Sequence, residues 1–127
     1  IVCMMLSDLF ISIELLILLQ LKNYICEFIL QTDEIAESKT RYGSINSLRH
    51  ILHHAFGTLM VLLILTIPLT ISAGLVLLEA VVHYHVDWLH MKYGAQSYKN
   101  KKYWQWLGAE MFAHQLTYIV ILILVTY

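Results

Sequence analysis

Four long apolar segments make up nearly the whole of this chain. They cover about residues 1–31, 48–67, 71–90 and 103–127. A helix that crosses a bilayer needs about 20 predominantly apolar residues, and each segment reaches that length. Charged residues are 13% of the chain, against roughly 25% in soluble domains. The sequence therefore predicts one all-α domain over residues 1–127, an integral membrane four-helix bundle.

The connections between these segments favour an antiparallel arrangement. The stretches TDEIAESKTRYGSINS (32–47) and MKYGAQSYKNKK (91–102) are polar. Between the second and third segments, IPLTISAG contains Pro68 and Gly74 but no charge, which is typical of a tight turn between antiparallel helices. We therefore expect a multi-pass protein with both polar loops on one side of the membrane.

Basic residues predict which side that is. Of the eight lysine and arginine residues, all but Lys22 lie in or beside the two polar stretches. Because cytoplasmic loops are rich in Lys and Arg, both polar loops are expected in the cytoplasm and both termini on the non-cytoplasmic side. The lipid bilayer is then the main partner, and the basic stretch 92–104 is expected to contact anionic lipid. The net charge of -1 argues against nucleic acid as a partner.

Ionisable residues inside the apolar segments recur at a spacing of four, which places them on one helix face. Such residues are costly in a membrane and by default suggest function. The spaced sets are Asn23, Glu27 and Gln31; His50 and His54; Glu79, His83 and Asp87; and Glu110 and His114. All of these sets fall in the half of their segment next to a polar loop, so we expect them to converge at one level near the cytoplasmic face.

Imidazole and carboxylate groups that converge in a helical bundle are the usual ligands of zinc, iron or manganese. The residues predicted to bind metal are Glu27, His50, His54, His83, Asp87 and His114. These are enough for one or two divalent transition-metal ions. Glu79 and Glu110 are the candidate catalytic bases. The alternative is a hydrogen-bonded polar core without a metal.

Other ionisable residues lie off these faces. His53 and His85 each point about 100° around the helix axis away from an adjacent candidate ligand position. His90 is expected nearer water. These three histidines are therefore predicted not to bind metal. Glu14 lies too far from Glu27 along the helix to share its site. It is expected to meet a partner subunit or to be protonated.

Four stretches of the sequence resemble those of a known family: KNYICEFILQTDEIAESK (22–39), HILHHA (50–55), HYHVDW (83–88) and EMFAHQLTY (110–118). They are similar to small bacterial and phage membrane proteins called domain of unknown function 3307. The residues that match the family pattern are Phe28, Leu30, Gln31, His50 or His54, His83, Asp87 and His114. The departures are Asn23 for histidine, Glu27 and Glu110 for aspartate, and Met111 for glutamine. The resemblance implies the bundle, the polar residues and the bacterial inner membrane, but no reaction.

Several functions are compatible with this pattern. The first is a metal-dependent membrane hydrolase that acts near the cytoplasmic headgroups. The alternative is a non-catalytic structural or accessory subunit of a larger membrane complex. A second alternative rests on HILHH (50–54), which resembles one histidine box of the membrane di-iron desaturases and hydroxylases. Those proteins carry three such boxes on a longer chain. A proton or metal-ion pathway ranks lowest, because few polar residues lie in the outer half.

Overall fold

The structure, a computed structural model, describes residues 2–30, 42–94 and 97–127. These residues form four α-helices and no strand: α1 (Val2–Tyr24), α3 (Ile45–Ile64), α4 (Leu69–Tyr93) and α5 (Lys101–Thr126). A short π-helix, η1 (Ile25–Ile29), continues α1. The prediction of an all-α chain with four helices is therefore confirmed. All four helices, with α1 and η1 counted as one, are long and apolar enough to cross a membrane.

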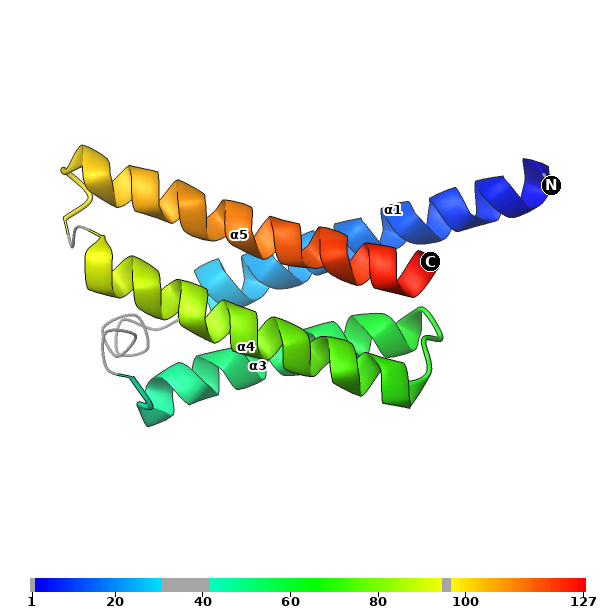
Figure 1. Cartoon of the computed structure of the whole chain (residues 1–127), viewed down its shortest axis with the longest axis horizontal. Coiled ribbons are helices and arrows are strands. Elements are labelled where there is room, and N and C mark those ends of the chain that lie inside the picture. The colour runs from blue at the N-terminus through cyan, green and yellow to red at the C-terminus, as the bar shows by residue number, and fades with distance from the viewer. Residues whose placement is uncertain (1, 31–41, 95–96) are drawn as a thin grey trace.

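The helices alternate in direction along the chain (Figure 1). Helix α1 packs on α3 and α5, and α4 also packs on α3 and α5, so each helix has two neighbours. Both termini lie at one end of the bundle, opposite the end where α4 stops and α5 starts (Figure 1). This arrangement is the antiparallel order that the short turn and polar loops predicted.

Local sequence signals explain where the helices begin and end. The Ser44 hydroxyl accepts a hydrogen bond from the Ser47 amide at 3.1 Å, and so starts α3 three residues earlier than the apolar segment. Between α3 and α4, Thr66 adopts a left-handed conformation with φ 63°. Pro68 then precedes the first residue of α4, a position at which it costs no helical hydrogen bond.

The interior of the bundle is divided into two halves. The half nearer the termini is apolar and is filled by Leu15, Leu19, Val61, Leu62, Leu75, Tyr118 and Ile121. The other half is filled largely by polar side chains, including four histidines that are about 1% exposed. Buried polar groups must find partners inside the protein. The polar half therefore contains the candidate site.

Candidate metal centre

Glu27 enters the interior from the π-helix at the end of α1. Residues Ile25–Ile29 form this wider turn, in which the Leu30 amide donates to the Ile25 carbonyl at 2.8 Å. Glu27 and Cys26 are its buried residues. Single π-turns in α-helices often occur at functional sites. Gln31, the last residue of the spaced set on this helix, lies outside the described residues.

One oxygen of Glu27 lies at the centre of the histidines. Its Oε1 atom is 2.8 Å from His83 Nε2, 3.2 Å from both His50 Nε2 and His54 Nε2, and 4.0 Å from His114 Nε2. These residues come from η1, α3, α4 and α5, so every side of the bundle contributes.

Asp87 faces the same nitrogens from α4. Its Oδ1 atom is 3.1 Å from His114 Nε2, and its Oδ2 atom is 3.3 Å from both His50 Nε2 and His83 Nε2. Thus all six residues predicted to bind metal come together. They form two overlapping sets whose ligand atoms lie within 4.8 Å of one another: Glu27, His50, His54 and His83; and Glu27, His83, Asp87 and His114.

The separations between these atoms suit a metal ion. Neighbouring ligands bound at roughly 2.0–2.2 Å from one ion lie roughly 2.8–3.6 Å from each other, depending on whether the geometry is octahedral or tetrahedral. The distances of 2.8–3.3 Å between the carboxylate oxygens and the Nε2 atoms of His50, His83 and His114 fall in that range. The residues could therefore hold an ion with little rearrangement.

A second buried network lies beside the cluster and is centred on Lys22. Its Nζ atom is 2.5 Å from Glu79 Oε1, 3.0 Å from the Tyr118 hydroxyl and 3.2 Å from His54 Nδ1. The Tyr118 hydroxyl in turn donates to Asn23 Oδ1 at 3.0 Å. Glu79, a predicted catalytic base, is therefore paired with a lysine and belongs to neither metal-ligand set. Spacing alone did not reveal this network.

Gly57 on α3 makes room for the Lys22 side chain. A Cβ atom at position 57 would lie 2.5 Å from Lys22 Cγ and 3.0 Å from Lys22 Cδ. The ammonium group is held by three partners, so the stem cannot move without loss of these contacts. Gly57→Ala should therefore destabilise the protein by about 1–3 kcal/mol, the usual cost of overpacking.

Thermal unfolding in detergent measures this effect. Gly74→Ala in α4 is the matched control, since a Cβ atom at that position has nothing within 4 Å. That variant should be slightly stabilised, by about 0.5–1 kcal/mol, because alanine is the better helix former. Equal stability of the two variants would contradict the packing of Lys22 against Gly57.

Glu110, the other predicted catalytic base, lies between two histidines. Its Oε2 atom contacts His90 Nδ1, and its Oε1 atom is 3.7 Å from His114 Nε2. His90, expected nearer water, is buried because Glu110 of α5 faces it across the helix interface. His85 is exposed and contacts Tyr42, as its rotation from the site predicted. Neither Glu110 nor His90 belongs to the metal-ligand sets.

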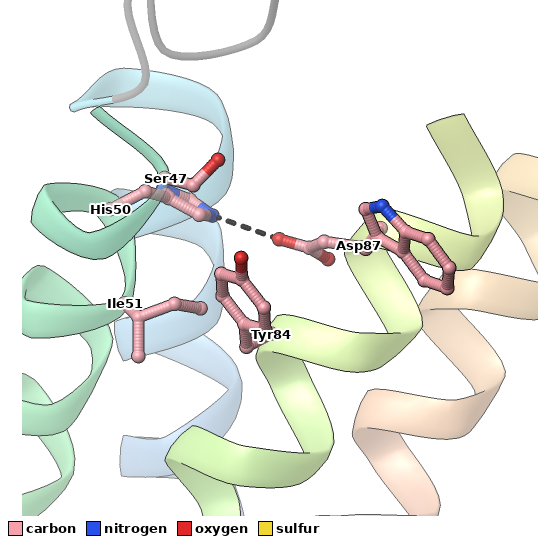
Figure 2. Close-up of a pocket in the computed structure, with 6 residues that line it drawn as sticks. Ser47, His50, Ile51, Tyr84 and Asp87 are labelled. Carbon is pink, nitrogen blue, oxygen red and sulfur yellow. Dashed lines mark ion pairs between the residues drawn. The ribbon is translucent and has the colours of Figure 1, made fainter. Parts of the chain in front are cut away.

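A narrow pocket reaches the cluster between α3 and α4. Figure 2 shows His50 and Asp87 facing each other across it, with the Tyr84 ring pointing into the gap between the two helices. The residues that line it are Ser47, His50, Ile51, Tyr84, Asp87 and Trp88. Its volume of about 10 Å³ is room for about one water molecule.

The family model described as "Protein of unknown function (DUF3307)" matches residues 15–127. The chain belongs to the DUF3307 family. The matched range contains every residue of the cluster and of the Lys22 network. No curated protein and no solved structure matches the chain. The resemblance seen in the histidine-bearing stretches is thus confirmed, and the DUF3307 family brings no established reaction with it.

Proposed function

We propose that this DUF3307 protein is an integral membrane metalloprotein whose buried cluster binds a divalent transition metal, zinc, iron or manganese, near the cytoplasmic face. The observation that carries the proposal is the convergence of Glu27, Asp87 and the Nε2 atoms of the histidines at about 3 Å separations. Such convergence from all four helices is the usual construction of metal sites in bundles.

Formal charge supports a cation at this site. The buried carboxylates are Glu27, Glu79, Asp87 and Glu110, whereas Lys22 is the one buried lysine or arginine among the described residues. Carboxylates buried without compensation are strongly unfavourable. Lys22 compensates Glu79 directly at 2.5 Å. A divalent ion would compensate the facing pair of Glu27 and Asp87.

Membrane insertion in the predicted orientation is part of this proposal. Large apolar side chains are exposed along the helices, for example Phe10, Leu52, Phe56, Leu77 and Phe112. Such a surface suits lipid. The excess of lysine and arginine in and beside residues 32–47 and 91–102 favours a cytoplasmic position for these loops, with both termini outside. The proposal places the protein in the bacterial inner membrane, as the resemblance to small bacterial and phage membrane proteins implies.

The reaction that best fits the site is hydrolysis. A bound divalent ion would activate a water molecule as nucleophile. The pocket beside His50 and Asp87 admits about one water and opens between α3 and α4. Glu110, which faces both His90 and His114, is better placed to accept a proton than Glu79, which is paired with Lys22. In the proposed orientation, this pocket would lie in the half of the bundle nearer the cytoplasmic headgroups.

A second candidate function is that of an accessory subunit in a larger membrane complex. Glu14 is exposed within the apolar span Met5–Ile29. A carboxylate that faces lipid is costly, which favours a partner helix at this surface. In this case the metal would be structural. The resemblance to the di-iron desaturases loses support, because His53 of the HILHH stretch is outside both ligand sets. The proton or metal-ion pathway also loses support, because an apolar layer around Leu62 fills the half of the described bundle nearer the termini.

Elemental analysis of the detergent-purified protein tests the proposal. The wild type should contain stoichiometric zinc, iron or manganese, and a His83→Ala, Asp87→Ala variant should contain none, because each contributes a donor at 2.8–3.3 Å from its neighbours. His85→Ala is the matched control, since His85 is an exposed histidine of the same helix. Wild type that is folded and free of metal would leave a hydrogen-bonded polar core instead.

A further inference from the structure

The Lys22 ammonium group has three N–H donors, and the structure gives it three acceptors. These are Glu79 Oε1 at 2.5 Å, the Tyr118 hydroxyl oxygen at 3.0 Å and His54 Nδ1 at 3.2 Å. The Tyr118 hydrogen is directed to Asn23 Oδ1, so its oxygen is free to accept from Lys22. Each hydrogen of the ammonium group therefore has its own partner.

This pattern fixes the tautomer of His54. A neutral imidazole carries one proton, and the nitrogen that accepts a hydrogen bond is the one without it. Since Nδ1 accepts from Lys22, the proton is on Nε2. That atom lies 3.2 Å from Glu27 Oε1, an ion-pair contact that is not aligned as a hydrogen bond. A protonated nitrogen has no lone pair for a metal, so His54 cannot be a ligand through Nε2 in this state.

Without His54, the remaining donors suit one ion. The set that contains His54 shares Glu27 and His83 with the other set. A second ion would keep only His50 as a donor of its own, and it would lie near the Lys22 ammonium, whose positive charge repels it. We propose that the centre, if it binds metal as described above, holds a single ion bound by Glu27, His83, Asp87 and His114. His50 then lies beside two of these ligands, 3.2 Å from Glu27 Oε1 and 3.3 Å from Asp87 Oδ2. Lys22 is then a positioning residue that keeps the His54 proton on Nε2 by donating to Nδ1.

The position of Lys22 is built into the packing as well as the hydrogen bonds. Its side chain is 5% exposed and passes over Gly57, where any Cβ atom would collide with it. Its Nζ atom also lies 4.8 Å from the centre of the Tyr118 ring, a favourable distance for a cation over an aromatic face. These contacts hold the ammonium group beside His54.

Titration with Co²⁺, followed by visible absorption and by metal content, tests the inference in the full-length protein. Wild type and His54→Gln should each bind one ion per chain with the same spectrum, because His54 is not a ligand in this arrangement and glutamine is a neutral residue of similar size. The affinity for Co²⁺ should change by less than about tenfold, since loss of a residue that supports a metal ligand lowers metal affinity by about 10–100-fold. His83→Gln is the control and should lose the ion. Two ions per wild-type chain, or a changed spectrum in His54→Gln, would overturn the inference.

A second variant isolates the role of Lys22. Lys22→Met combined with Glu79→Gln removes both charges at similar volume and frees His54 Nδ1 to carry the proton. His54 Nε2 can then bind metal, so the Co²⁺ spectrum should change, and adding His54→Gln should reverse that change. A folded double variant with the wild-type spectrum would overturn the role of Lys22. If the double variant does not fold, the His54→Gln comparison decides the inference by itself.

The outcomes also separate this inference from the proposed function. Wild type that binds no Co²⁺ would overturn the metal centre and the single-ion inference together. An effect confined to His54→Gln, with wild type and His83→Gln behaving as expected, would overturn the single-ion inference alone and leave the metal centre in place.

Discussion

Lys22→Met should lower the free energy of unfolding by about 3–5 kcal/mol, the cost of removing one partner from a buried ion pair. The variant leaves Glu79, which is 2% exposed, without its partner at 2.5 Å. It also removes the donor to Tyr118 and His54. The loss should be visible as a large fall in the thermal unfolding temperature in detergent.

Two comparisons show whether the ion pair is the cause. Lys22→Met with Glu79→Gln should regain most of the lost stability, because a neutral pair needs no compensation. Lys101→Met, at an exposed position at the start of α5, should change the stability by no more than about 0.5 kcal/mol. A Lys22→Met single variant as stable as wild type would show that Lys22 is not held inside the bundle.

If the centre binds metal as proposed, removal of the ion by a chelator should be the second large effect. An ion that binds only the folded protein adds about 4 kcal/mol of stability when its free concentration is 1,000 times its dissociation constant. The chelated protein should therefore unfold at a markedly lower temperature. In the chelated protein the carboxylates of Glu27 and Asp87 would still face each other across His50, but no metal ion would lie between them.

The variant Asp87→Asn provides the matched test. It keeps the size of the side chain but removes the charge of a proposed ligand, so its unfolding temperature should be low both with and without chelator. His85→Ala should respond to the chelator as wild type does, since His85 contacts Tyr42 and Val81 rather than the cluster. Identical unfolding curves for wild type with and without chelator would argue for a polar core without metal.

The six metal-ligand candidates could be predicted because two simple rules apply to them. A spacing of four residues fixes a helix face, and distance from a polar loop fixes the depth. Glu27 and Asp87 both satisfy these rules and both contact His50 in the structure. No long-range information was needed beyond the antiparallel order of the helices.

The same rules place Glu79 and Glu110 on the helix faces that point into the bundle, but they do not predict the partners of these residues. Four residues correspond to about 6 Å along a helix axis. Glu79 is therefore one turn away from His83, at the level of Lys22, and Glu110 is one turn away from His114, beside His90. Spacing predicts which side a residue faces, but not which partner from another helix lies at its height.

Lys22 itself could not be placed from the sequence. A lysine side chain is long enough to reach the membrane surface or to turn inward, and its partner Glu79 is 57 residues away. Gly57 leaves space for the lysine stem, but its importance is clear only from the packing of α1 against α3.

The division of the bundle into a polar and an apolar half has a consequence for biogenesis. Helix α4 carries Glu79, His83 and Asp87, and a charged acidic residue at the centre of a lone membrane helix costs roughly 2.5–3.5 kcal/mol. Helix α3 supplies His50, which lies 3.3 Å from Asp87, and only the short turn around Thr66 and Pro68 separates the two helices. If the protein inserts into the membrane as proposed, entry of α3 and α4 together as a hairpin would let these groups meet before either helix is surrounded by lipid.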